Sequence, residues 1–215
     1  MTQSPVEART EGDQEIVSGY AAVYFDERDS GTEYVLWDEP GWGRCVERVR
    51  QGAYDRAARE DDVRALVNHE PSLLLGRNRA GTMRLKTDAT GLHYECDVPR
   101  TNAGRDCLIS IGRGDMTGSS YSFVPRKITW EEDNDAKLYV RWIEDVDLWD
   151  VGPVTFPAFE ATSTQVGRSL ILGDARDEFK HWRSVVKPPK RSYIREVDVR
   201  LRMIELEMGV AEPIV

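Results

Sequence analysis

The sequence predicts a mainly β domain with one or two helices, closed into a small antiparallel barrel. Within residues 16–165, several segments alternate apolar and polar side chains with a period of two, and clusters of Gly, Pro and Asp separate them. Helical spacing occurs only in short stretches. The chain has 215 residues, of which 40% are hydrophobic and 31% charged, which is enough for one well-filled core. A small barrel is the closed form that such strands favour.

The first half of the chain is predicted to contain strands and one short helix. Residues 1–15 are polar and expected to be mobile, so the first strand is placed at residues 19–25. Residues 26–44 have the Gly, Asp and Pro density of a long loop. A short helix is expected from about Ala53, and residues 63–69 then alternate as a strand.

The second half is predicted to open with a hairpin. Residues 81–88 and 91–99 read as two strands joined by an Asp-Ala-Thr-Gly turn. A helix follows, for which Thr101 is a suitable N-cap and Gly112 a suitable left-handed residue at the C-terminal end. The remaining strands extend from residue 118 to Pro157.

The tail differs in composition from the rest of the chain. We expect a mobile N-terminus at 1–15, a β-barrel domain at 16–170, and a charged linker with a C-terminal helix at 171–215. The helix is placed at 194–208, with an apolar seam of Val197, Leu201, Ile204 and Met208. Its spacing fits docking on its own domain as well as docking on another chain.

Charge and cysteine content exclude several classes of function. The formal net charge of −9 repels phosphates, so nucleic acid is not the expected partner. No N-terminal apolar segment and no membrane-spanning stretch is found, and the three cysteines lack a CxxC pair, which favours a reducing, cytosolic setting. No metal-ligand spacing or phosphate-binding loop occurs, so we expect no metal and no cofactor.

Only three histidines are available as a general base at neutral pH. His181 lies in the tail, and His93 alternates with an apolar set, so both are expected at the surface. His69 differs because it follows the apolar face of residues 63–67 to the end of a strand, where a side chain leaves the core and stays rigidly held.

A nucleophile and an orienting acid are also present. Ser120 lies among small residues at the start of a strand, and alternation puts it on one face with Ser122. Asp150 interrupts an apolar strand and would orient the imidazole, with Glu70 as a competing candidate. Considered alone, these residues also fit a structural histidine and a merely polar strand face.

Seven short segments follow one another in a recognisable order. They lie at residues 19–23, 52–54, 68–70, 81–85, 91–92, 114–123 and 154–159, and include Asn-His-Glu at 68–70 and Ser-Tyr-Ser-Phe at 120–123. In this order they resemble the tailed-phage prohead (capsid maturation) serine protease family, over about Gly19 to Thr164. That family is similar in fold to the herpesvirus maturational protease (assemblin), a small β-barrel surrounded by helices.

The resemblance implies roles for three residues. Its His and Ser motifs match His69 and Ser120, and an acidic position matches Asp150. The family commonly has Ser where this chain has Gly152, and Gly where it has Ser122. The herpesvirus enzymes use a second His as the third member, and this chain has none there.

The function implied is that of a serine endopeptidase acting through an acyl-enzyme. It would cleave the scaffold region of the major capsid protein, and itself, inside the assembling prohead in the host cytoplasm. Backbone amides near residues 112–114 are candidate oxyanion donors. The alternatives are a non-enzymatic capsid assembly or scaffold module of the same fold and an unrelated esterase, and a homo-oligomer is left open.

Overall fold

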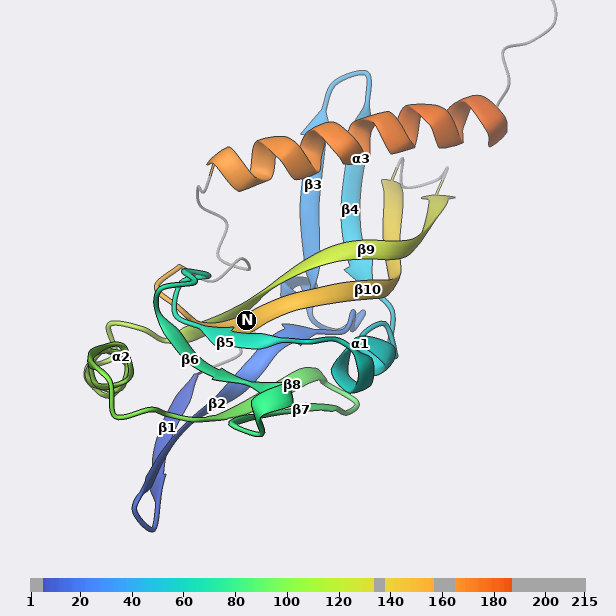
Figure 1. The fold of residues 1–215 in the computed structure, drawn as a ribbon. Helices are drawn as coiled ribbons and strands as arrows, with labels where there is room; N and C mark the ends of the chain where they lie inside the picture. Colours follow the sequence, from blue (N-terminus) through green and yellow to red (C-terminus); the bar gives the residue numbers. More distant parts are fainter. Residues whose placement is uncertain (1–5, 134–137, 157–164, 187–215) are drawn as a thin grey trace, which may run out of the picture. The chain divides into compact units, whose positions relative to one another are not determined.

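The structure is a computed structural model that describes residues 6–133, 138–156 and 165–186. Within these residues it contains ten strands and three α-helices (Figure 1). The chain divides by its internal contacts into two units, Met1–Ser163 and Thr164–Val215. The first unit contains all the strands and the candidate site.

The first sheet has four antiparallel strands. In spatial order they are β1 (Glu7–Glu11), β2 (Gln14–Val23), β8 (Gly91–Asp97) and β7 (Met83–Thr87). The hairpin expected between the two segments after residue 81 is confirmed as β7 and β8. The folded part starts earlier than the sequence predicted, because Gly12 adopts a φ of 60° and lets β1 pair back onto β2.

The second sheet has six strands. They are β3 (Glu33–Glu39), β4 (Gly43–Val49), β5 (Arg64–Leu66), β6 (Leu74–Arg77), β9 (Gly118–Asp133) and β10 (Leu138–Val154). β10 pairs with β9 along most of its length in the antiparallel sense, and with β4 and then β5 in the parallel sense. β3 forms inside the segment expected to be one long loop, because Gly41 and Gly43, both at positive φ, turn it back onto β4.

The closed antiparallel barrel expected from the sequence is not what the described residues form. They form two separate sheets, and two of the strand pairs are parallel. Period-two alternation reports which face of a strand is buried, but it carries no information about the direction of the neighbouring strand or about closure. The mainly β class with a few helices is confirmed.

Two α-helices belong to the first unit, α1 (Asp55–Glu60) and α2 (Asn102–Arg113). Thr101 caps α2 as expected, and its hydroxyl accepts a hydrogen bond from the Gly104 amide at 3.2 Å. The helix ends at Arg113 and is capped by Gly114 rather than by Gly112, because Gly114 is the residue that adopts the left-handed conformation, with φ 78°. Two 3₁₀ turns, Ser30–Thr32 and Asn78–Ala80, complete the unit.

The second unit is described only through α3 (Gln165–Val186). This helix includes residues that the sequence marked as a mixed, charged linker. The helix expected at 194–208 and the basic stretch before it lie outside the described residues. None of the helices in the described ranges is long and apolar enough to cross a membrane.

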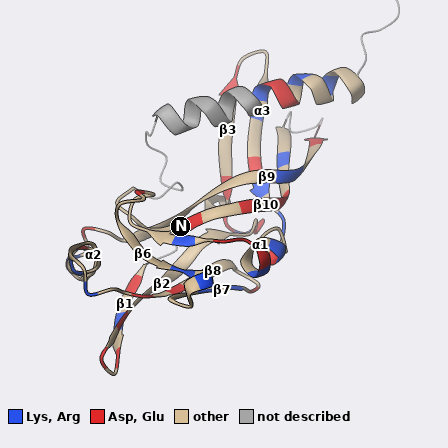
Figure 2. Cartoon of the chain, in the orientation of Figure 1, with Lys and Arg blue, Asp and Glu red and all other residues tan. Residues whose placement is uncertain are grey.

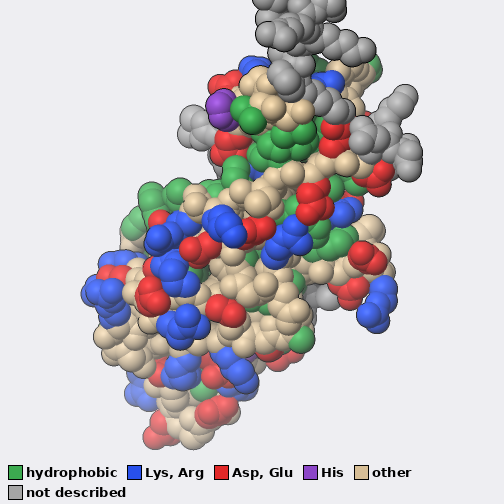
Figure 3. Space-filling model, turned by 90° about the vertical axis from the view of Figure 1, so that its right-hand side faces the viewer, with side chains coloured by type: hydrophobic (Ala, Val, Ile, Leu, Met, Phe, Trp, Pro, Cys, Tyr) green, Lys and Arg blue, Asp and Glu red, His purple; other side chains and the backbone are tan. Residues whose placement is uncertain are grey.

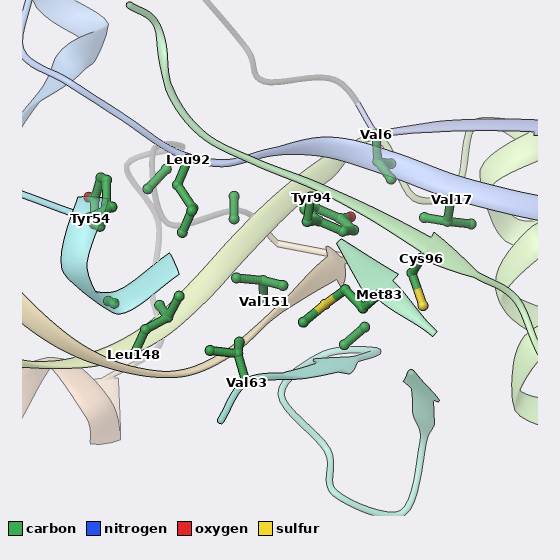
Figure 4. Close-up of a cluster of buried hydrophobic side chains, with 14 of the residues drawn as sticks. Val6, Val17, Tyr54, Val63, Met83, Leu92, Tyr94, Cys96, Leu148 and Val151 are labelled. Carbon is green, nitrogen blue, oxygen red and sulfur yellow. The ribbon is translucent and has the colours of Figure 1, made fainter. Parts of the chain in front are cut away.

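The core of the first unit contains side chains from both sheets. Tyr94 of β8 and Met83 of β7 lie in one buried cluster with Leu148 and Val151 of β10 (Figure 4). All four side chains are at most 2% exposed. Burial of each such side chain contributes about 1.5–3 kcal/mol, so this cluster fixes β10 against the first sheet.

Charges of both signs are interspersed over the first unit. Acidic and basic residues lie close together on β9, β10 and α1 (Figure 2), and the face seen in Figure 3 has the same mixed character. Many form ion pairs across neighbouring elements, such as Arg56 of α1 with Asp145 of β10 at 3.1 Å. The acidic excess of the chain is therefore partly offset locally by guanidinium partners.

Candidate active site

His69 lies in a tight turn between β5 and β6. The Glu70 amide donates a hydrogen bond to the Val67 carbonyl at 3.0 Å, and Asn68 and His69 both have positive φ, 54° and 57°. Two consecutive positive φ values are typical of a type I′ turn. For residues other than Gly, each such conformation costs about 1–3 kcal/mol, and it persists only where the surroundings hold it. The turn, and not the end of a straight strand, sets the direction of the imidazole.

Two hydrogen bonds attach this turn to the end of β10. The Asn68 amide donates to the Pro153 carbonyl at 3.0 Å, and the Asn68 side-chain oxygen accepts from the Thr155 amide at 2.8 Å. Gly152 completes the attachment, because a Cβ at this position would lie 2.0 Å from the Leu66 carbonyl oxygen. Only glycine allows β5 to approach β10 this closely.

Asp150 is aimed by a β-bulge in β10. Leu148 is paired with Phe123 and Asp150 with Ser122, so Trp149 is an extra residue without a partner. Leu148 and Val151, three positions apart, therefore both point into the core (Figure 4). In a regular strand, residues 148 and 150 share a face. The bulge reverses the alternation and places Asp150 on the face away from the core.

The turn and the bulge bring His69 and Asp150 together. His69 Nδ1 lies 2.5 Å from Asp150 Oδ1, and the Asp150 side chain is 11% exposed against 33% for His69. Ser122 Oγ lies 3.0 Å from the same nitrogen. A carboxylate only accepts hydrogen bonds, so this contact places the hydrogen on Nδ1 and leaves the lone pair of a neutral imidazole on Nε2.

The two serines at the start of β9 point to opposite faces. Ser119 Oγ lies 2.9 Å from the hydroxyl of Tyr94, inside the core. Tyr121 also faces the core, where its hydroxyl pairs with that of Tyr54 at 3.0 Å, and burial raises the pKa of both tyrosines above the ordinary value. Ser120, between them, faces the side on which Asp150 lies.

Ser120 is next to the His69–Asp150 pair but is not bonded to it. It is paired across the strands with Gly152, two residues beyond Asp150, and is 7% exposed. No hydrogen bond joins the Ser120 hydroxyl to His69 among the described residues. In serine hydrolases this bond is often long until substrate binds, so its absence in the free protein is compatible with Ser120 as the nucleophile.

A family model described as caudovirus prohead serine protease matches residues 3–172 of the 215-residue chain. The chain belongs to this family. No curated protein and no solved structure matches it. Membership in the prohead protease family indicates a serine protease of phage prohead maturation that associates with the phage capsid. His69, Ser120 and Asp150 all fall inside the matched range.

The other candidates considered for this prohead protease are engaged elsewhere. Glu70 accepts hydrogen bonds from the amide and hydroxyl of Ser72, which lower the pKa of its carboxyl, and it does not bond His69. His93 of β8 packs edge-on against Tyr20 of β2, with ring centroids 5.0 Å apart. His181 lies exposed on α3.

The amides proposed as oxyanion donors are also engaged. The Gly114 amide donates to the Ile111 carbonyl at 2.9 Å and closes the end of α2. Residues 112 and 113 lie in the last turn of the helix, where amides donate along the helix. These groups stabilise the helix, and they are not directed at the serine.

Sequence reasoning missed two features of this prohead protease. The contact of Ser122 with His69 was not expected, although alternation placed this serine on the right face. The bulge could have been detected in the sequence, because the buried apolar residues at 146, 148 and 151 are spaced by two and then by three positions. Such a break is the signal by which a bulge next to a site is found.

Proposed function

We propose that this prohead protease is a serine endopeptidase in which Ser120 is the nucleophile, His69 the general base and Asp150 the residue that orients it. The observation that supports the proposal best is the 2.5 Å contact between His69 Nδ1 and Asp150 Oδ1, on the face towards which Ser120 points. Such a pair fixes the imidazole tautomer that a serine nucleophile requires.

The chemistry follows from the tautomer. With its hydrogen on Nδ1, the imidazole of His69 takes the Ser120 proton at Nε2 as the serine oxygen attacks a peptide carbonyl. The protonated ring then gives that proton to the leaving amine, and an ester to Ser120 remains. Water, deprotonated by the same nitrogen, releases the acid and restores the serine. The Asp150 carboxylate stabilises the imidazolium that forms between these steps.

The spacing of residues along β9 is compatible with these different roles for the two ring nitrogens. Two residues on one face of a strand are about 7 Å apart, a spacing that suits a ring that contacts Ser122 through Nδ1 and extends towards Ser120 through Nε2. Nε2 is the nitrogen left for Ser120. Ser119 is unsuitable as the nucleophile because its hydroxyl is buried against Tyr94.

The substrates proposed are the scaffold region of the major capsid protein and the protease itself, cleaved inside the assembling prohead. Family membership supports the association with the capsid. A non-enzymatic assembly module of the same fold is the competing function. Such a module has no need for an oriented imidazole beside a serine, so the site geometry favours the enzyme.

The test is co-expression of the chain with its capsid protein, followed by intact mass measurement of both. Wild type is compared with Ser120→Ala and with Ser119→Ala, a matched change one residue away on the opposite face. Cleavage is expected in wild type and Ser119→Ala and is lost in Ser120→Ala. Identical masses in all three would refute the enzyme and favour the assembly module, and cleavage by Ser120→Ala would refute the nucleophile.

A further inference from the structure

We infer that Ser122 is a positioning residue for the general base: its hydroxyl oxygen shares the hydrogen on His69 Nδ1 with Asp150 and holds the plane of the imidazole. This inference rests on the proposed function, because it assigns a role in orienting the base. Ser122 does not touch the substrate in this role, and it acts only through His69.

The contact has the geometry of a clamp. Nδ1 lies 3.0 Å from Ser122 Oγ on β9 and 2.5 Å from Asp150 Oδ1 on β10. Ser122 and Asp150 are directly paired across these two strands. The imidazole therefore lies across the β9–β10 ladder and contacts both of these paired strands.

The position of the hydrogen determines which role Ser122 can have. The carboxylate of Asp150 has no hydrogen to donate, so the short contact requires the hydrogen to be on Nδ1. Ser122 Oγ then accepts a share of the same hydrogen in a three-centre bond. A nitrogen that carries a hydrogen cannot take the proton of Ser122, so the serine next to Nδ1 is not activated as a nucleophile.

The clamp matters because His69 is otherwise only partly enclosed. Its side chain is 33% exposed, and its backbone lies in a turn rather than in a strand. A flip of the ring would put the carbon Cδ2 where Nδ1 now lies, and both acceptor contacts would be lost. Ser122 adds a second contact that disfavours the flip and small rotations of the ring.

The experiment measures the rate at which a fluorophosphonate probe modifies Ser120, over about pH 5 to pH 9, where histidine titrates. The variants are Ser122→Ala and Ser122→Thr, with Ser110→Ala on the surface of α2 as the matched control. Asp150 is the titratable group in contact with His69, and Glu70 of the same turn is bonded to Ser72. Thermal melting checks that each variant is folded.

Ser122→Ala is expected to lower the plateau rate about three- to ten-fold, the loss of one modest hydrogen bond. The acid side of the curve of labelling rate against pH should also move to lower pH, because the protonated imidazole loses a hydrogen-bond acceptor that stabilises its charge. A defect in folding alone would not shift this part of the curve. Ser122→Thr keeps the hydroxyl and should restore both values, and Ser110→Ala should match wild type.

An unchanged plateau and an unchanged acid side of the curve in Ser122→Ala would overturn the inference while leaving the nucleophile assignment intact. Labelling that is lost in Ser122→Ala and kept in Ser120→Ala would make Ser122 the nucleophile, and would overturn both. Failure of the folded wild type to react, combined with intact capsid protein in the co-expression test, would remove the proposed function itself.

Discussion

Gly152→Ala is expected to displace His69, the proposed general base, although it changes none of the three proposed catalytic residues. The added Cβ would lie 2.0 Å from the Leu66 carbonyl oxygen and 3.0 Å from its carbonyl carbon, whereas ordinary contact starts at 3.4 Å. The opposing atoms are backbone, so no side-chain rotation relieves the overlap. The strands must separate by roughly 1 Å, because close-packed interiors absorb extra volume by backbone shifts.

This displacement reaches His69 directly. Leu66 ends β5 three residues before His69, and the turn between them is bonded to the end of β10. A misplacement of about 1 Å in a catalytic group lowers the rate by about 10²-fold. Overpacking of this kind costs about 1–3 kcal/mol of the free energy of unfolding. For a domain of this size, that corresponds to a fall of about 2–12 °C in Tm.

The assay combines fluorophosphonate labelling of Ser120 with thermal melting. Gly112→Ala is the matched control, because the same methyl group meets nothing within 4 Å there. It should label at the wild-type rate and melt no lower, since Ala favours a helix over Gly. Gly152→Ala that labels and melts as wild type would refute the idea that close contact between β5 and β10 places the base.

Three further predictions concern the site and its surroundings. Asp150→Asn should lower the labelling rate by about 10³- to 10⁴-fold, because an amide no longer enforces the hydrogen on Nδ1; a rate within ten-fold of wild type would contradict the assigned orienting role. Ser119→Ala should lower the free energy of unfolding in urea by about 1–3 kcal/mol, because the buried Tyr94 hydroxyl loses its partner, and adding Tyr94→Phe should recover most of the loss. If the two substitutions instead lowered the free energy of unfolding additively, the hydrogen bond between Ser119 and Tyr94 would be contradicted. Burial raises the pKa of the Cys45 and Cys96 thiols to about 12, from an ordinary value of 9.0. The unfolded chain therefore releases these protons first, and the free energy of unfolding should fall as the pH rises from about 9 to about 12, as denaturant titrations at several pH values would measure.

The sequence predicted the individual elements better than their assembly. Alternation and turn residues identified the β7–β8 hairpin, and the capping residue Thr101 identified the start of α2. The predictions of a closed barrel and of antiparallel strands throughout were wrong, because closure and strand direction depend on which distant strand lies beside β10. No local pattern encodes that choice.

In the candidate site too, the sequence predicted the individual residues better than their arrangement in space. The residue types and the family resemblance singled out His69, Ser120 and Asp150, and the structure brings the first and third into contact. The turn at residues 67–70 could not be predicted from the sequence. His69 follows Val67 at the spacing of two that the preceding strand residues have, so the segment looks like a continuing strand. Its positive φ values arise from bonds to β10, which are contacts between segments far apart in the chain.

The bulge at Trp149 has a consequence for how this protein tolerates mutation. The orientation of Asp150 depends on its cross-strand pairing with Ser122, and not on the identity of the extra residue. Trp149 is 62% exposed, so many side chains should be accepted at this position. Deletion of its single codon would leave Leu148, Asp150 and Val151 consecutive in a regular strand with their present partners, so the carboxylate would stay on its present face. Substitution and deletion of Trp149 are therefore both expected to leave the orientation of Asp150 unchanged.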